Sequence, residues 1–204
     1  MTLKIIVVVL IGYFLGNVQF GIIIAQRFGL QDIRKVGSGG TGATNVLRSV
    51  GIGPSALTLL CDAAKAIVAG LIGMLIFAGE LRLYGAMLGG ILAIVGHNWP
   101  VLYGFRGGKG VAASFGAVTV VAPFIGLLAI LVFALLVLIF RIVSIASMVV
   151  AFGAAVALIV FNWGDPYFLL FGLAIFFMIL YSHRENIKRL KNGTEKTISF
   201  SSKK

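Results

Sequence analysis

The chain of 204 residues is 60% hydrophobic and only 11% charged, which excludes an ordinary soluble domain, where about a quarter of the residues are charged. Its formal net charge of +11 lies almost entirely between the apolar blocks, as expected for cytoplasmic loops of a membrane protein or for surfaces that attract anionic lipids and phosphorylated substrates. A single cysteine, Cys61, excludes an internal disulfide and a multi-cysteine metal site.

The first half of the chain predicts three membrane-spanning helices, because about 20 apolar residues are needed to cross roughly 30 Å of hydrocarbon. The first apolar block follows Lys4 and lacks a clear small-residue cleavage site, so we expect a retained helix and not a signal peptide. Pro54 suits the first turn of the second helix. In chain order we expect a helix at residues 5–25, a polar segment at 26–53, a helix at 54–77, a connection without net charge at 79–82 and a helix at 83–99.

The second half contains one ambiguous apolar block at residues 111–140. Its length fits either one steeply tilted helix or two short spans that turn near Ala122 and Pro123. The flanking pattern is clearer. It predicts a polar segment at residues 100–110 before the block and, after it, a helix at 142–161, a tight turn at 162–166, a helix at 167–182 and a basic tail.

The distribution of charge favours two spans in residues 111–140. Two crossings place all the strongly basic segments on one side, whereas a single crossing would put the basic tail opposite the first two polar segments, against the positive-inside rule. We therefore predict an all-α, polytopic transmembrane bundle of seven spans, with the N-terminus outside, the C-terminus cytoplasmic and the fourth helix short and partly re-entrant. Residues 1–204 are expected to form one integral membrane domain, with residues 192–204 as a flexible tail.

The first polar segment carries a glycine-rich motif at residues 37–48. Glycines allow successive backbone N–H groups to point at one anion, a helix starting near Thr44 adds further amide donors, and Arg48 can hold phosphate through two parallel hydrogen bonds. The alternative is a flexible loop. The motif lacks the Gly-Lys-Ser/Thr ending of a nucleotide-binding loop. Candidate phosphate-handling residues here are Ser38, Gly39, Gly40, Thr41, Gly42, Thr44, Asn45 and Arg48.

The second polar segment repeats this combination of glycine and positive charge. It begins with His97, which suits either a catalytic base or a structural hydrogen-bonder near a helix end. Its glycines again permit close backbone approach, and Lys109 supplies a point charge. The candidate residues are His97, Arg106, Gly107, Gly108, Lys109 and Gly110.

The third polar segment follows the last helix. If that helix continues, His183 and Asn186 lie one turn apart on one face, whereas a basic segment that binds lipid head groups is the competing interpretation. Within the membrane, Asp62 and Lys65 are spaced for a structural ion pair, and Ser144 can complete a polar rim.

Taken together, the three segments resemble the bacterial acyl-phosphate:glycerol-3-phosphate acyltransferase family, PlsY. The family patterns are Ser-Gly-Asn-x-Gly-x-Thr-Asn-x-x-Arg, Gly-His…Pro…Phe-Lys-Gly-Gly-Lys-Gly-Val-Ala and His-x-x-Asn-Ile-x-Arg-Leu…Gly-x-Glu. The chain departs from them at Gly40, where the family has Asn, and at Arg106, which replaces Lys. The matches are Ser38, Gly39, Gly42, Thr44, Asn45, Arg48; Gly96, His97, Pro100, Phe105, Gly107, Gly108, Lys109, Gly110, Val111, Ala112; and His183, Asn186, Ile187, Arg189, Leu190, Gly193, Glu195.

The resemblance implies an enzyme that transfers a fatty acyl group from acyl phosphate to the 1-hydroxyl of sn-glycerol 3-phosphate, giving lysophosphatidic acid and phosphate. We expect direct transfer without an acyl-enzyme and without metal, cofactor, nucleotide, coenzyme A or nucleic acid. The site would face the cytoplasm in a bacterial inner membrane. Expected catalytic residues are Ser38, Arg48, Lys109, His183 and Asn186, with Asp62, Lys65 and Glu195 structural.

Three questions stay open at this stage. The proton of the acceptor hydroxyl could pass to His183 or to a substrate phosphate. A phosphotransferase of phospholipid head groups is an alternative, but it would need a metal and the six acidic residues are scattered singly. A transporter of small phosphorylated anions is the second alternative. The sequence shows no long-period internal repeat, which argues against it.

Overall fold

The computed structural model describes residues 1–198, which form helices and connecting turns without a β-strand. The long helices are α1 (Thr2–Asn17), α4 (Ile52–Phe77), α5 (Arg82–Asn98), α7 (Pro123–Phe140), α8 (Val143–Phe161) and α9 (Pro166–Ser182). The shorter elements are α2 (Phe20–Arg27), α3 (Ala43–Ser49), α6 (Val111–Val121), α10 (Arg184–Lys191) and the 3-10 turns η1 (Ile33–Lys35), η2 (Gly79–Leu81) and η3 (Val101–Tyr103).

Five helical segments are long and apolar enough to cross a membrane: Thr2–Arg27, Ile52–Phe77, Gly79–Tyr103, Pro123–Phe140 and Val143–Phe161. A sixth is the pair formed by α9 and α10, which is bent by 57°. The all-helical, multi-span architecture predicted from the sequence is therefore confirmed. The apolar helix α6, with 11 residues, is too short to span alone, because a full crossing needs about 20.

The division of residues 111–140 into two helices is also confirmed, at the predicted position. Ala122 takes a non-helical conformation that ends α6, and Pro123 is the first residue of α7. Proline suits this position because its missing N–H has no helical partner to lose.

The first span is less regular than predicted, because α1 ends at Asn17 and α2 starts at Phe20. Val18 lies between them in an extended conformation, and its carbonyl oxygen accepts a hydrogen bond from the Lys65 ammonium on α4. A buried cation therefore compensates for the backbone hydrogen bonds lost at the break.

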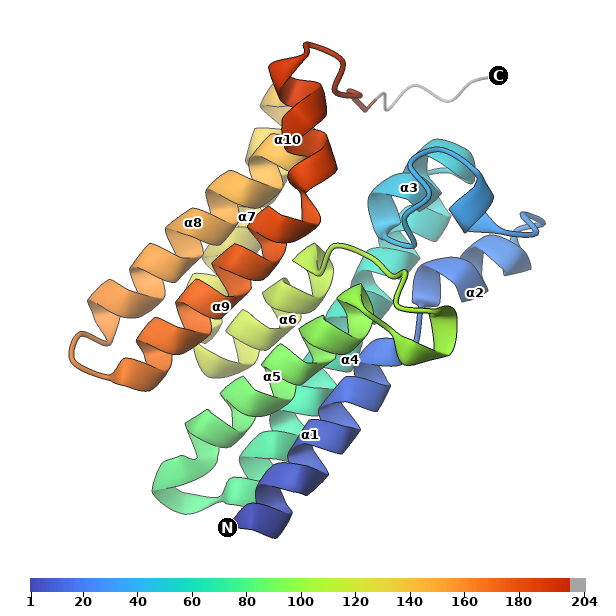
Figure 1. The fold of residues 1–204 in the computed structure, drawn as a ribbon. Helices are drawn as coiled ribbons and strands as arrows, with labels where there is room; N and C mark the ends of the chain where they lie inside the picture. The colour runs from blue at the N-terminus through green and yellow to red at the C-terminus, as the bar shows by residue number, and fades with distance from the viewer. Residues whose placement is uncertain (199–204) are drawn as a thin grey trace.

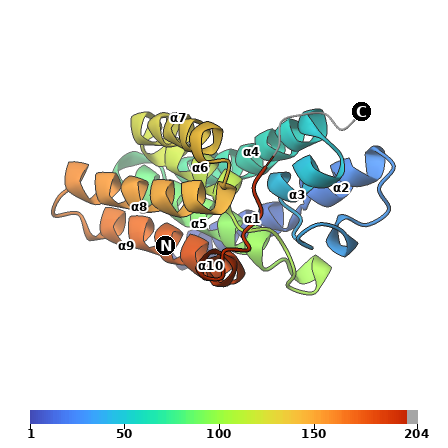
Figure 2. The same cartoon turned by 90° about the horizontal axis from the view of Figure 1, so that it is seen from above.

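The helices form a two-part bundle (Figures 1 and 2). Helices α1, α4, α5 and α6 make one part, and α7, α8 and α9 pack on its side. Helices α4 and α5 approach closely because small residues face one another: a Cβ added to Gly85 would overlap the Gly73 backbone, and one added to Gly89 would overlap that of Ala69. Close contact of this kind through small residues is the usual way helices associate in lipid.

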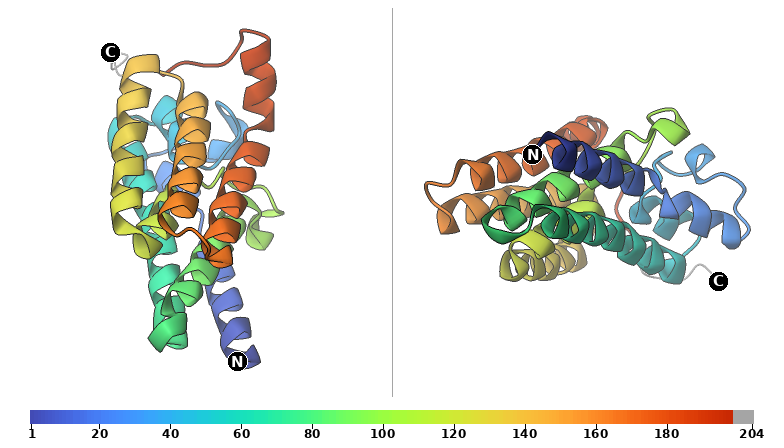
Figure 3. Two further views of the ribbon diagram at one scale, coloured as in Figure 1. Left: turned by 90° about the vertical axis from the view of Figure 1, so that its left-hand side faces the viewer. Right: turned by 90° about the horizontal axis from the view of Figure 1, so that it is seen from below.

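The polar segments gather at one end of this bundle (Figures 1 and 3). Helices α3 and α10 and the described end of the chain lie there, whereas the N-terminus, η2 and the turn between α8 and α9 lie at the other end. At that other end, Tyr84 donates a hydrogen bond to Asp165 across 3.1 Å. The uncharged and acidic connections are thus separated from the basic ones.

Candidate functional site

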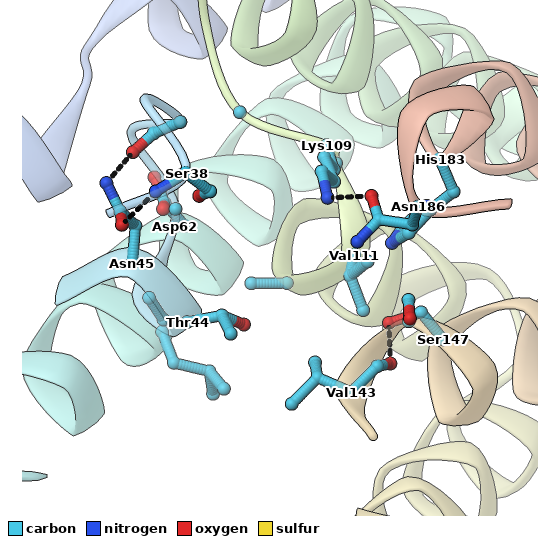
Figure 4. Close-up of a pocket in the computed structure, with 18 of the residues that line it drawn as sticks. Ser38, Thr44, Asn45, Asp62, Lys109, Val111, Val143, Ser147, His183 and Asn186 are labelled. Atoms are coloured by element: carbon cyan, nitrogen blue, oxygen red, sulfur yellow. Dashed lines mark hydrogen bonds between the residues drawn. The ribbon is translucent and has the colours of Figure 1, made fainter. Parts of the chain in front are cut away.

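A pocket opens at the basic end, between the first glycine loop, α4, the start of α6, the start of α8 and the junction of α9 with α10 (Figure 4). It brings together most of the residues predicted for the site: Ser38, Gly40, Gly42, Thr44, Asn45, Arg48, Asp62, His97, Gly108, Lys109, Gly110, Ser144, His183, Asn186 and Glu195. The predicted residues outside its lining are Gly39, Thr41, Lys65, Arg106 and Gly107.

Asn45 shapes the first glycine loop from within. Its side-chain amide donates to the carbonyl oxygens of Ile33, Val36 and Gly40 at 3.0, 3.1 and 2.9 Å, and its Oδ1 accepts from the Ser38 N–H at 2.9 Å. Because these bonds occupy both ends of the amide, Asn45 holds the loop in shape and presents Ser38 to the pocket.

Thr41 faces away from the pocket and is buried. Its hydroxyl donates to Gln19 Oε1 across 2.6 Å, and Gln19 in turn donates to the His97 carbonyl oxygen at 3.2 Å. Thr41 therefore ties the first loop to the break between α1 and α2. Gln19 gave no signal in sequence because it lies inside an apolar block.

Two cations from distant parts of the chain reach the pocket. The Arg48 guanidinium donates to the Lys196 carbonyl oxygen at 3.0 Å, while its buried Nε has no partner within residues 1–198. Burial lowers the pKa of Arg48, an effect that Glu195 opposes. Lys109 donates to Asn186 Oδ1, and burial, together with the neighbouring Arg189, lowers the pKa of Lys109 to about 8.

His183 lies at the bend between α9 and α10, so the helix does not continue straight as supposed. The pocket nonetheless receives both His183 and Asn186. His183 Nδ1 lies 2.8 Å from the Ile179 carbonyl oxygen. A carbonyl oxygen can only accept, so Nδ1 carries the proton and the Nε2 lone pair of the neutral ring is available.

Glu195 closes the pocket from the end of the described chain. It accepts hydrogen bonds from Ser144 at 2.8 Å, Asn186 at 2.6 Å and Arg189 at 2.8 Å. Burial alone would raise the pKa of Glu195, but these three donors outweigh it and hold the pKa below its usual value. Arg189 was matched to the family motif but was not predicted as a site residue.

Residues 192–198, which belong to the expected flexible tail, contact the end of the bundle. Residues 194–198 fold back over the end of the bundle from α10 (Figure 2). Ile198 is buried and donates its N–H to the Arg141 carbonyl oxygen at 2.9 Å, and Lys196 lies 3.5 Å from the Gly37 carbonyl oxygen. The remaining part of that expectation, residues 199–204, lies outside the described residues.

Asp62 and Lys65 form the predicted buried ion pair, with 2.8 Å between Asp62 Oδ1 and Lys65 Nζ. His97 joins them, since its Nδ1 lies 2.9 Å from Lys65 Nζ. Asp62 and His97 reach the pocket wall and Lys65 does not. Across the described part of the chain, no group of three or more His, Cys, Asp or Glu residues is arranged to hold a metal ion.

The pocket thus joins cations and amide donors to an apolar wall, a combination that suits a phosphorylated substrate with a lipid chain. A family model described as glycerol-3-phosphate acyltransferase matches residues 6–193. The chain belongs to the glycerol-3-phosphate acyltransferase family. The resemblance inferred from the three motifs is confirmed.

Relatives cover nearly the whole chain. The glycerol-3-phosphate acyltransferase of Alkaliphilus metalliredigens is 39% identical over 196 residues, covering 95% of both chains. That of Clostridioides difficile is 42% identical over 197 residues, again 95% of both. The crystal structure of PlsY (YgiH), an integral membrane glycerol 3-phosphate acyltransferase in its glycerol 3-phosphate form, matches with a TM-score of 0.87 and 35% identity over 96% of each chain.

This glycerol-3-phosphate acyltransferase is therefore a membrane enzyme. Membership in the family argues against the transporter and phosphotransferase alternatives.

Proposed function

We propose that the enzyme transfers a fatty acyl group from acyl phosphate to the 1-hydroxyl of sn-glycerol 3-phosphate, giving lysophosphatidic acid and inorganic phosphate. The observation that carries this proposal is the meeting of Arg48 and Lys109 in one pocket. Both proposed substrates carry phosphate, and charge-assisted hydrogen bonds from Arg and Lys are the strong contacts for its oxygens. The remaining candidates in the lining supply backbone and side-chain donors.

The walls of the pocket support a lipid-linked donor. Leu59, Val111, Phe133 and Val143 line it together with the polar residues, so an acyl chain can lie against them while its phosphate remains at the basic end. The first loop lacks the ending of a nucleotide-binding loop, which favours a donor already activated by phosphate over one activated by a nucleotide.

Transfer is direct in this proposal. The acceptor oxygen forms a bond to the carbonyl carbon, the bond from that carbon to the phosphate oxygen breaks, and its electron pair leaves with phosphate. Ser38, His183 and Asn186 orient the hydroxyl and the carbonyl. The hydroxyl proton passes to His183 Nε2, whose lone pair is available in the neutral ring, or to a substrate phosphate oxygen.

Ser38 and Cys61 are poorly equipped to form an acyl-enzyme. A serine nucleophile requires an adjacent base, and within the described chain the hydrogen bond at Ser38 is its backbone N–H to Asn45. Cys61 does not line the pocket. An acyl phosphate is also activated enough to make a covalent intermediate unnecessary.

The test is purified full-length protein with acyl phosphate, glycerol 3-phosphate and a chelator, without nucleotide, coenzyme A or added metal. We expect lysophosphatidic acid and phosphate in equal amounts. Product formation only with a thioester donor would contradict the proposed donor, and solute flux in vesicles without acyl transfer would indicate transport.

Withholding glycerol 3-phosphate tests the direct step. We expect slow phosphate release without an acylated peptide in mass spectrometry, then rapid turnover once the acceptor is added. A phosphate burst equal to the enzyme concentration together with an acylated peptide would contradict direct transfer.

We also propose seven spans, with α6 as a short fourth one, the N-terminus outside and the C-terminus in the cytoplasm of a bacterium with this enzyme in its inner membrane. The segregation of basic and acidic connections to opposite ends supports this orientation.

A further inference from the structure

His97 lies where the two glycine loops and the buried ion pair meet. Its carbonyl oxygen accepts from the Gly108 N–H at 3.0 Å and from Gln19 Nε2 at 3.2 Å. Its imidazole is 3% exposed, and a Cβ added to Gly108 would overlap His97 Nε2. The Nε2 edge of the ring therefore lies directly against the second glycine loop, in the wall of the pocket.

The other ring nitrogen is occupied by Lys65. The Lys65 ammonium contacts three groups: the Val18 carbonyl oxygen, Asp62 Oδ1 at 2.8 Å and His97 Nδ1 at 2.9 Å. His97 Nδ1 also lies 3.4 Å from Asp62 Oδ1, which is farther than the Lys65 ammonium. An ammonium group has N–H donors and no acceptor, so the closer contact of Nδ1 is with a donor. His97 Nδ1 must then be the acceptor, and the proton of the neutral ring is on Nε2.

We infer that His97 is a fixed hydrogen-bond donor, whose Nε2–H contacts a phosphate oxygen of the substrate held by the glycine loop at residues 107–110. Lys65 is a positioning residue that sets the tautomer, and Asp62 keeps Lys65 charged and in place. The part of this inference that names a substrate phosphate rests on the proposed function. The assignment of the tautomer does not. It excludes His97 as the proton acceptor, a role that the sequence left open.

His183 provides an internal contrast, because its bond to Ile179 O fixes the opposite tautomer. One histidine of the site therefore donates from Nε2 and the other offers a lone pair there. The chain has only these two histidines, so a spectrum of selectively labelled protein contains only their signals.

The first test is NMR of the full-length protein in detergent with ¹⁵N-labelled histidine, assigned through His97→Gln. We expect one ring with the Nε2–H pattern, His97, and one with the Nδ1–H pattern, His183. Titration with inorganic phosphate should shift the Nε2–H signal of His97. An Nδ1–H or doubly protonated His97, or a signal that phosphate leaves unmoved, would overturn the inference.

This experiment needs no acyl donor, so its outcome is separate from that of the acyl-transfer assay. The predicted tautomers combined with a failed transfer assay would remove the proposed donor and leave the tautomer assignment standing. The other tautomer of His97 combined with normal acyl transfer would overturn the tautomer assignment and leave the proposed donor standing.

The second test compares two replacements of His97. The amide NH₂ of glutamine in His97→Gln can occupy the place of Nε2–H, whereas that of asparagine in His97→Asn falls near the place of Nδ1. We expect His97→Gln to keep kcat/KM for glycerol 3-phosphate within about tenfold of the wild type and His97→Asn to lose about tenfold to a hundredfold, mainly through KM. Equal losses in the two variants would contradict a donor at Nε2.

The positioning role is tested in the double variant Asp62→Asn with Lys65→Met. Removing both charges avoids leaving one of them buried and unpaired. We expect the ring pattern of His97 to change to a mixture of tautomers and KM for glycerol 3-phosphate to rise more than kcat falls. A ring that keeps the pure Nε2–H pattern in a folded double variant would show that Lys65 does not set it.

Discussion

The two cations of the pocket differ in how firmly they hold their charge. Arg48 stays charged across the pH range of an assay, because the ordinary pKa of a guanidinium is so high that lowering by burial leaves the group protonated. Lys109 is different, because burial brings its pKa to about 8. The proposed recognition of phosphate by the free enzyme therefore depends on pH through Lys109.

We predict that kcat/KM for glycerol 3-phosphate falls above pH 8, as Lys109 loses its proton with rising pH. The substrate phosphate does not contribute to this change, because its second pKa is about 6. Lys109→Arg should have a lower rate but no such decline, because arginine keeps its charge. Measuring kcat/KM from pH 6 to 10 for both proteins checks this, and an unchanged decline in Lys109→Arg would assign it to another group.

Asn45 offers a second prediction at this scale. Asn45→Ala removes four hydrogen-bond contacts that shape the first glycine loop, three of them shared by the two N–H groups of one amide, and a single hydrogen bond is worth about 1 kcal/mol net. We expect KM for glycerol 3-phosphate to rise about tenfold or more, equivalent to ~1.4 kcal/mol. The matched control is Asn162→Ala, which loses one bond to Leu158 O at the opposite end of the bundle and should keep the wild-type KM.

Sequence could identify which residues of the polar segments matter but not their division of labour. Asn45 and Thr41 were grouped with the phosphate ligands because glycine-rich loops commonly use such side chains as donors. Only the fold brings the backbone carbonyls to Asn45 and the buried Gln19 to Thr41. The partners of Asn45 are near in sequence but are backbone carbonyls, which no residue pattern marks, and Gln19 lies in an apolar block where local pattern carries no signal.

At the scale of elements, the stretch at residues 194–198 is a structural part of the site. It connects α10 to α8 through Glu195 and Ser144, contacts α3 through the Lys196 carbonyl oxygen, which accepts from Arg48, and contacts the first loop through the Lys196 ammonium at Gly37. The sequence predicts a flexible tail here. The contacts of this stretch are with partners distant in sequence, which the local sequence does not reveal.

We predict that Glu195→Gln lowers kcat/KM by about tenfold to a hundredfold, because charge-assisted bonds contribute about 1.5–3 kcal/mol each. The loss should come with faster amide hydrogen exchange in α10, measured on the protein in detergent, because the contacts that hold this end of the bundle are weakened. The matched control is Glu185→Gln. Its pair with Lys188 is exposed, at 58% and 70% for the two side chains, and exposed pairs contribute about 0–1 kcal/mol. Equal effects of the two substitutions would contradict a special role of Glu195.

The helices themselves were largely predictable. Proline chemistry placed the junction of α6 and α7 at Pro123, and apolar length gave the others. The break at Val18 was not predictable, because the residue that compensates for it, Lys65, is on another helix. Apolar length finds a span but does not show where a partner helix interrupts it.

At the scale of the whole molecule, orientation in the membrane stays a prediction. Single cysteines placed at Gln31 and Asn192 in a Cys61→Ala background should react with an impermeant reagent only from the cytoplasmic side. A cysteine at Trp163, which is 84% exposed in the turn between α8 and α9, should react only from the outside. Labelling of positions 31 and 192 from opposite sides would mean an odd number of crossings between them and would contradict the seven-span proposal.

The mixed wall of the pocket has a kinetic consequence. In the proposed reaction its polar end is supplied from water and its apolar side from the membrane, so the two substrates come from phases of different dimension. The amount of the proposed donor, acyl phosphate, that the enzyme meets is then a surface density, and inert detergent or lipid dilutes it even when the volume is constant. The apparent KM for the donor should rise in proportion to added inert amphiphile, while that for glycerol 3-phosphate stays constant. A cell that enlarges its membrane without making more donor would lower the surface density of the donor and so slow this enzyme.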